Sequence, residues 1–175
     1  ILTQSFEDNK SVNYIVKQDR NRLKRIKALM SYSFDVCYLF GDALLSDDKK
    51  ACALIVYPHQ KKNSLKSVWL GVKLAFNCIG ISNLGKAMKR EAAIRKEHPT
   101  TNISYLWFIG VEPAEQGKGI GTALMKQIIS ESEKLNRPIY LETSTDKNIP
   151  WYQKFGFKIY RELDFGYKLY CMRRE

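Results

Sequence analysis

The sequence is poor in the residues that cross-link small proteins or bind metals. Its 175 residues include two histidines and four cysteines, Cys37, Cys52, Cys78 and Cys171. The cysteines lie far apart and form no C-x-x-C pair, so the sequence predicts neither a zinc site nor a dense disulfide framework. This pattern fits a reducing compartment, and we expect a cytoplasmic protein without a metal.

Long uninterrupted apolar runs are also missing. The longest apolar stretch, residues 68–81, contains Lys73 and Asn77 and is too short to span a bilayer. No basic leader followed by an apolar run opens the chain, which argues against secretion. We therefore expect no transmembrane helix and no membrane partner.

Acidic residues are few relative to basic ones. Lysine and arginine number 29 against 18 aspartate and glutamate, which gives a formal net charge of +11. A positive field attracts nucleic acid, anionic lipid or a phosphorylated cofactor, and charge alone leaves a nucleic-acid-binding protein open. The basic clusters at 20–27, 61–62 and 86–96 are interleaved with apolar residues, so we interpret them as solvated faces and loops and expect no nucleic-acid partner.

The composition is that of a folded globular protein, with 45% hydrophobic and 12% aromatic residues. The length fits one core, and we expect a single domain over residues 1–175. Leu23, Ile26 and Met30 recur at spacings of three and four, which predicts a helix within residues 19–32.

The next segments predict a hairpin and two helices. Strand-like runs at 38–45 and 51–57 flank a turn, and Ser64 and Ser82 can each cap a helix, the second ending before Pro99. The first helix should bury a face made of Leu65, Val68, Val72, Phe76 and Ile79. The second should turn Leu84, Ala87, Met88 and Ala92 inward, and Lys86, Lys89, Arg90, Arg95 and Lys96 outward.

The last third alternates strands and helices. A continuous apolar run at 105–111 predicts a strand covered on both faces and central to its sheet. Residues 139–143 predict a second strand and residues 148–155 a short helix. Two final strands are predicted at 157–160 and 167–172.

A glycine-rich segment, residues 116–122, joins the central strand to a helix. A phosphate needs several donors, which main-chain amides provide where side chains are small and a helix begins. Gly117, Gly119 and Gly121 meet that need, and the helix dipole adds roughly half a positive charge. The segment predicts a pyrophosphate cradle built from amides.

Two other glycine motifs fit less well. A P-loop ends in Gly-Lys-Ser/Thr, whereas Gly121 and Thr122 follow Ile120 here. A dinucleotide-binding fold needs G-x-G-x-x-G near the first strand of a βαβ unit, and this loop comes late in the chain.

The segment resembles the defining motif of the GNAT family, the GCN5-related N-acetyltransferases. That motif is Gln/Arg-x-x-Gly-x-Gly/Ala, and the chain has Gln116-x-x-Gly119-x-Gly121. The resemblance extends through residues 108–124. It resumes at 151–157, Trp-Tyr-Gln-Lys-Phe-Gly-Phe, which is similar to the family's second conserved block.

The resemblance implies a mixed α/β fold, with a mostly antiparallel central sheet and helices on both faces. The strands at 105–111 and 139–143 would diverge to admit acetyl-CoA. It implies an N-acetyltransferase in which a primary amine attacks the thioester directly, in a ternary complex. The acceptor would be a small molecule or a peptide bound by residues 14–100, and a homodimer is left open.

Cofactor contacts follow from the resemblance position by position. Main-chain groups of Ile109, Gly110 and Val111 would bind the acetyl carbonyl and the pantetheine arm, and Asn148 would contact the cofactor further along. Glycine at 110 fits either a bulge or the close approach of a neighbour. The pyrophosphate would be held by amides of Gln116, Gly117, Lys118, Gly119, Ile120, Gly121 and Thr122.

Tyr152 stands where many family members place a tyrosine that protonates the departing thiolate. Its hydroxyl titrates near 10 and a thiol near 8.5, so a neutral tyrosine can donate as charge develops on sulfur. Packing beside Trp151 and Phe155 is the alternative role.

The general base is the least defined residue of the site. Some family members carry a glutamate in the central strand where this chain has Tyr105, so a catalytically silent acyl-CoA-binding or regulatory module stays open. Glu142 is the first candidate, with solvent exposure or a lysine partner as its alternative role. His98 and Glu112 are further candidates.

Overall fold

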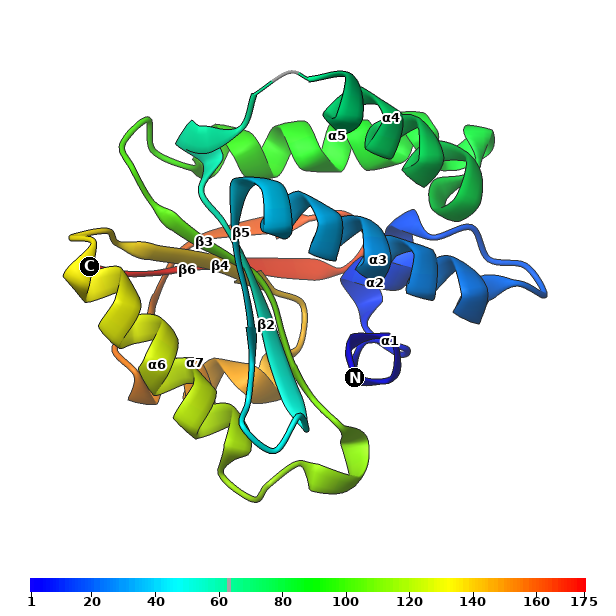
Figure 1. Ribbon diagram of the computed structural model, residues 1–175. Helices are drawn as coiled ribbons and strands as arrows, with labels where there is room; N and C mark the ends of the chain where they lie inside the picture. Colours follow the sequence, from blue (N-terminus) through cyan, green and yellow to red (C-terminus); the bar gives the residue numbers. More distant parts are fainter. Residues whose placement is uncertain (63) are drawn as a thin grey trace.

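A six-stranded sheet forms the centre of the computed structural model, which describes residues 1–62 and 64–175 (Figure 1). The strands are β1 (Gly41–Leu45), β2 (Ala51–Val56), β3 (Ser104–Val111), β4 (Ile139–Thr143), β5 (Lys158–Asp164) and β6 (Lys168–Arg174). Their order is β1-β2-β3-β4-β6-β5, and every neighbouring pair is antiparallel except β3 and β4. The mixed, mostly antiparallel sheet is confirmed.

Helices cover both faces of this sheet (Figure 1). They are α1 (Leu2–Ser5), α2 (Lys10–Ile15), α3 (Arg22–Phe40), α4 (Leu65–Leu74), α5 (Ile81–Glu97), α6 (Ile120–Lys134) and α7 (Ile149–Lys154). The first three lie on one face, where α4 packs against α3 and α5 against α2, and α6 and α7 cover the other face. A π-helical turn (Ala75–Ile79) continues α4.

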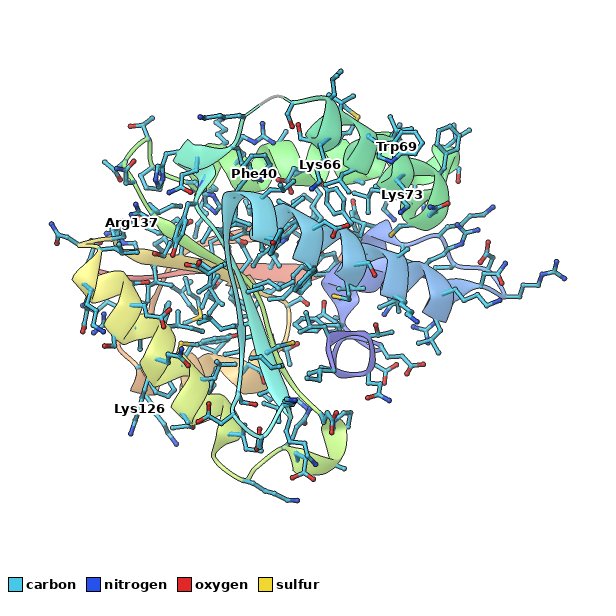
Figure 2. The ribbon with its side chains drawn as sticks, in the orientation of Figure 1. Phe40, Lys66, Trp69, Lys73, Lys126 and Arg137 are labelled. Carbon is cyan, nitrogen blue, oxygen red and sulfur yellow. The ribbon has the colours of Figure 1, made fainter. Side chains whose placement is uncertain are left out.

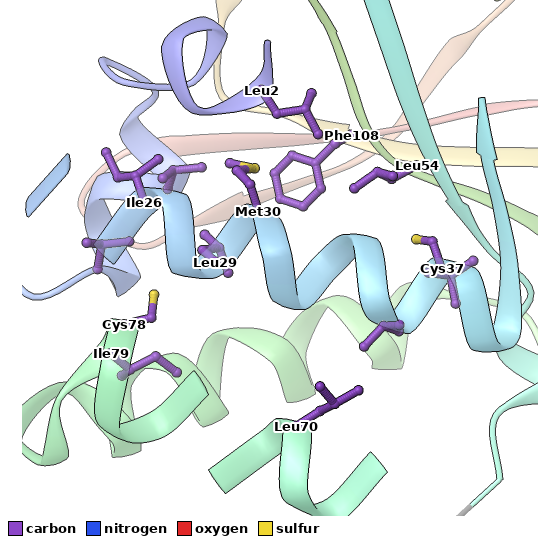
Figure 3. Close-up of a cluster of buried hydrophobic side chains, with 14 residues drawn as sticks. Leu2, Ile26, Leu29, Met30, Cys37, Leu54, Leu70, Cys78, Ile79 and Phe108 are labelled. Atoms are coloured by element: carbon purple, nitrogen blue, oxygen red, sulfur yellow. The ribbon is translucent and has the colours of Figure 1, made fainter. Parts of the chain in front are cut away.

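Alternate side chains of β2 enter two hydrophobic cores, as the period of a strand requires. Leu54 and Val56 pack against α3 in the first core, which Figure 3 shows, whereas Ala53 and Ile55 pack against α6 and α7 in the second. Ile26, fully buried in the first core, contributes about 1.5–3 kcal/mol relative to an exposed side chain. The sheet is therefore fixed from both faces.

The helix α3 runs further than its sequence pattern predicts. It continues through Phe40, so the strand predicted from residue 38 begins at Gly41 instead. Val36 and Cys37 extend the buried stripe of this helix, and tertiary packing overrides the strand-like character of the segment. A Cβ on Gly41 would collide with the main chain of Ile55, so a glycine is needed where the chain enters β1.

Ser64 caps α4 as predicted, but Ser82 caps nothing. The Ser64 hydroxyl accepts a hydrogen bond from the Ser67 amide at 3.1 Å. The helix α5 begins one residue before Ser82, because Gly80 has a φ of +74° and turns the chain directly into it. It ends at Glu97, before Pro99, as expected.

The faces predicted for α4 and α5 are partly reversed. Leu65, Val68, Val72 and Phe76 are exposed, whereas Leu70 on the other side of α4 is buried. On α5, Met88 points outward and Arg90 lines an internal cavity. Periodicity identifies residues that share a face, but it does not decide which of two apolar faces meets the core.

No single helix in the described residues has the length and apolarity of a membrane span. The segments Leu65–Ile79 and Ile81–Glu97 meet those criteria only as a pair, which is bent by 117°.

Candidate active site

The site lies where β3 and β4 separate. These strands pair only at Ser104 with Ile139 and Tyr105 with Tyr140, and no further pair joins them within the described ranges. A cavity of about 740 Å³ opens between them, under α4 and α5. It brings together four residues that the sequence analysis singled out: Ile109, Glu142, Asn148 and Tyr152.

The glycine loop follows β3 and leads into α6. Gly117 and Gly119 have φ values of +81° and +87°, and a Cβ on either would meet no atom within 4 Å. The amides of residues 117–122 have no hydrogen-bond partner within the described part of the chain. Open space beside unpaired amides at the start of a helix fits a pyrophosphate.

Gly121 has a different role in the loop. A Cβ on this residue would come within 3.1 Å of Val111 Cγ2, so its small size lets the first turn of α6 approach the end of β3. The loop is also held by Glu115, which pairs with Lys118 at 2.9 Å and with Lys50 at 3.2 Å. Lys118 first, and then Lys50, holds the pKa of Glu115 below its usual value.

The end of β3 is in contact with α1. The Ser5 hydroxyl donates a hydrogen bond of 2.7 Å to the Val111 carbonyl, and Gln116 Nε2 lies 3.4 Å from the same oxygen. A Cβ on Gly110 would come within 2.9 Å of Leu2, so close approach explains this glycine. The bulge in β3 lies instead opposite the Leu54–Ile55 step of β2, at Trp107.

Main-chain groups of successive residues in β3 point to opposite edges of the strand, so the three residues predicted to contact the cofactor do not all face the same way. The Glu112 amide donates to the Lys50 carbonyl at 2.8 Å, which places the amide of Gly110, two residues earlier, on the β2 side as well. The groups of Ile109 and Val111 therefore point to the open edge.

Tyr152 lies in α7 and contacts the cavity through a buried ring. It is 7% exposed and packs edge-on against Trp151 and Phe157. Burial raises the pKa of its hydroxyl, so the group is neutral at physiological pH. This hydroxyl has no hydrogen-bond partner among the described residues, which leaves it free to donate to a ligand.

Glu142, in β4, is held by two neighbours. Its side chain is 4% exposed, with Oε1 2.9 Å from His98 Nε2, and the Tyr105 hydroxyl donates to Oε2 at 2.6 Å. Burial, and then the charge of Glu142, raises the pKa of Tyr105, so the tyrosine remains a donor. Glu142 neither faces solvent nor pairs with a lysine of the described chain.

The other predicted residues lie outside this cavity. His98 does not line the cavity but contacts two residues that do, Glu142 and Tyr105. The partly exposed Glu112 lies 4.0 Å from Lys50 in the loop beyond β3. Glu112 is therefore not placed to accept a proton there. The glycine loop follows the C-terminal end of β3, whereas β3 pairs with β4 at its N-terminal end.

Arg90 is a cavity residue that the sequence analysis placed on the outside. Its Nε donates to the Tyr167 hydroxyl at 3.0 Å, and its Nη2 bonds the Ser11 hydroxyl. The spacing of the residues could have indicated this position. Arg90 shares a helix face with Ala87, three residues before it, and with Ile94, four residues after it.

Comparison with known proteins points to one class, the acetyltransferases. Residues 79–159 match the model of the acetyltransferase (GNAT) domain. An uncharacterized N-acetyltransferase of Schizosaccharomyces pombe is 43% identical over 53 residues. That match covers 30% of this chain and only 22% of the yeast protein.

Solved structures share the fold over nearly the whole chain. The histone acetyltransferase HPA2 and related acetyltransferase from Corynebacterium glutamicum has a TM-score of 0.69 at 17% identity, covering 99% of this chain and 86% of its own. The C-terminal condensation domain of Ebony, in complex with beta-alanyl-dopamine, has a TM-score of 0.64 at 12% identity, covering 100% and 91%. Residues 79–159 are therefore similar to the GNAT acetyltransferase domain, and the whole chain shares the fold of the acetyltransferase from Corynebacterium glutamicum.

Proposed function

We propose that the protein is an acetyl-CoA-dependent N-acetyltransferase that acts on a primary amine. The observation that carries this proposal is that one cavity between the splayed strands is lined by two buried groups, the carboxylate of Glu142 and the hydroxyl of Tyr152. Among the described residues this hydroxyl has no hydrogen-bond partner. An amine acetylation needs a proton acceptor and a proton donor on either side of the reacting carbonyl.

The residues present fit acetyl-CoA, which would supply the acetyl thioester. The amides of residues 117–122 would hold its pyrophosphate, and Asn148 would contact it further along. Of the main-chain groups predicted on β3, those of Ile109 and Val111 are best placed for the acetyl carbonyl and pantetheine arm. The Val111 carbonyl already accepts from Ser5, so its amide would be the binding group.

Glu142 would accept a proton from the acceptor ammonium, which makes the amine nucleophilic. Tyr105 and His98 would hold the carboxylate in the orientation in which it can accept this proton. The amine nitrogen would then bond to the acetyl carbon as the carbon–sulfur bond breaks, and Tyr152 would donate its proton to the leaving sulfur. The second proton of the amine would leave the new amide nitrogen and, through solvent, restore the tyrosine hydroxyl. Positioning of the two reactants in a ternary complex supplies much of the acceleration.

A silent acyl-CoA-binding module is the second candidate, motivated by Tyr105 at the position where some family members carry a glutamate. The Glu142 carboxylate, hydrogen-bonded to this same tyrosine, favours the enzyme. A silent module would bind acetyl-CoA and turn over no amine.

Release of free coenzyme A, followed with a panel of small amines and peptides, tests the proposal. We expect amine-dependent release that Glu142→Gln lowers by about 10²–10⁴-fold. Glu112→Gln is the matched control and should keep wild-type rates. Acetyl-CoA binding, measured separately by calorimetry, should survive both changes; binding without turnover on any amine would favour the silent module.

A further inference from the structure

The outer face of α4 and its π-helical turn is apolar and uncovered. We define this outer face as Leu65, Val68, Trp69, Val72 and Phe76, which recur at spacings of three, one, three and four. Leu65 is 92% exposed, and Trp69 and Phe76 are 64% and 65% exposed. The opposite side of the same helix packs against the rest of the protein, because Leu70 is buried and Leu74 lines the cavity.

Such a face costs free energy in water unless something covers it. Isolated exposed apolar residues are ordinary, but a continuous row that includes a tryptophan and a phenylalanine marks an interaction site. Ile81 and Met88, on the adjoining α5, are also exposed, at 76% and 63%. Exposed apolar side chains therefore occur on both helices.

The segment that carries this face has charges of one sign. From Lys49 to Arg90 the sequence has nine lysines and arginines and no aspartate or glutamate. Figure 2 shows Lys66 and Lys73 beside Trp69 on α4, on the side of the molecule away from α6 and Lys126. Within the described part of the chain, Lys66, Lys73 and Lys89 form no ion pair.

We propose that the outer face of α4 docks on an anionic lipid surface. Its apolar side chains would enter the boundary between headgroups and acyl chains, while the flanking lysines contact lipid phosphates, as in interfacial amphipathic helices. The expectation of no membrane partner rested on the length of the apolar run. That length bears on crossing a bilayer and not on lying along its surface.

Charge favours lipid over the other occupants of an apolar face. A second copy of the chain packed face to face would bring two unpaired lysine rows together, which like-charge repulsion disfavours. Nucleic acid would satisfy the lysines but leave Leu65 and Phe76 in water. An anionic bilayer satisfies both kinds of side chain. Because α4 also lines the cavity, docking places the candidate site beside the bilayer.

Co-sedimentation with vesicles tests the docking. We expect binding to phosphatidylcholine mixed with phosphatidylglycerol, weaker binding to phosphatidylcholine alone, and loss with added salt. Lys66→Glu with Lys73→Glu should weaken binding at least tenfold, since each lysine near an anionic surface contributes appreciably. Lys126→Glu with Lys134→Glu, on α6, changes the net charge equally and should leave binding nearly unchanged.

The apolar contribution has its own pair of variants. Trp69→Ser with Phe76→Ser should abolish binding, whereas Trp69→Phe, which keeps an apolar ring, should retain it; circular dichroism checks that each variant is folded. Absence of binding to anionic vesicles at low salt would overturn the proposal. So would a dimer, seen by sedimentation velocity, that the serine pair dissociates, since a second copy would then cover this face.

Discussion

The Tyr105 hydroxyl donates a hydrogen bond to Glu142 Oε2 across 2.6 Å, from β3 to the adjacent parallel strand β4. Tyr105 pairs with Tyr140 in the sheet, and Glu142 follows two residues later on the same face of β4. Some members of the GNAT family carry a glutamate at the position of Tyr105. In this chain the buried carboxylate comes from the neighbouring strand, and the tyrosine at 105 orients it.

Replacing Tyr105 with phenylalanine should slow acetyl transfer without weakening cofactor binding. The change removes one hydrogen bond to a charged group, worth about 1.5–3 kcal/mol, so kcat should fall by roughly 10- to 100-fold. The KM for acetyl-CoA should be unchanged, because Tyr105 lies near the start of β3 and the glycine loop follows the end of that strand. Steady-state kinetics measures both quantities, and a rise in that KM with unchanged kcat would contradict the role.

Tyr152→Phe should lower kcat by about 10²-fold or more, since it removes the proposed proton donor to sulfur. Tyr160→Phe is the matched control, because the Tyr160 hydroxyl contacts the Glu97 carbonyl at 3.3 Å and does not line the cavity. Calorimetric binding of acetyl-CoA to both variants should stay close to wild type. Equal kcat in the two variants would reduce Tyr152 to a packing residue.

Gly119→Ala should weaken coenzyme A binding, and Gly166→Ala should not. Both glycines have left-handed backbones, with φ of +87° and +82°, and both have open space around a Cβ. Each substitution should therefore cost about 1–2 kcal/mol of folding stability. Thermal unfolding measures that shared cost. Calorimetry separates the two, and equal affinities for coenzyme A would argue against an amide cradle at residues 117–122.

Alkaline pH should destabilise the protein partly through Tyr152. Burial raises the pKa of this hydroxyl in the folded state, so folding favours the protonated form. Its stabilisation is complete below the unfolded pKa, near 10, and is lost as pH rises from there toward the folded pKa. Over that window Tyr152→Phe should lose about 1 kcal/mol less stability per pH unit than wild type, measured by urea unfolding. Parallel curves would show that the hydroxyl is not buried.

Local signals in the sequence predicted most of the sheet. The run at 105–111, the turn after residue 45 and the segment at 139–143 became β3, the β1–β2 hairpin and β4. The short helices α1 and α2 were not predicted, because four and six residues are too few to show a helical period. Their positions depend on tertiary contacts such as the bond from Ser5 to Val111.

The residues of the candidate site also differ in whether the sequence alone could predict their roles. The glycine loop is contiguous in the sequence, so a phosphate-binding role for its amides could be predicted before the fold was known. The contacts of His98 and Tyr105 with Glu142 span 44 and 37 residues, and only the sheet brings them together. Arg90 escaped because its charge suggested solvent, whereas its spacing with Ala87 and Ile94 indicated the interior.

The most direct test of the central claim is a mass-spectrometric count of acetylated amine and free coenzyme A in the same reaction. With acetyl-CoA and a panel of primary amines, we expect at least one amine to yield the two products in a one-to-one ratio. Glu142→Gln should bind acetyl-CoA but lose this yield. Tight acetyl-CoA binding by the wild-type protein, with no acetylated product from any amine class, would contradict the account.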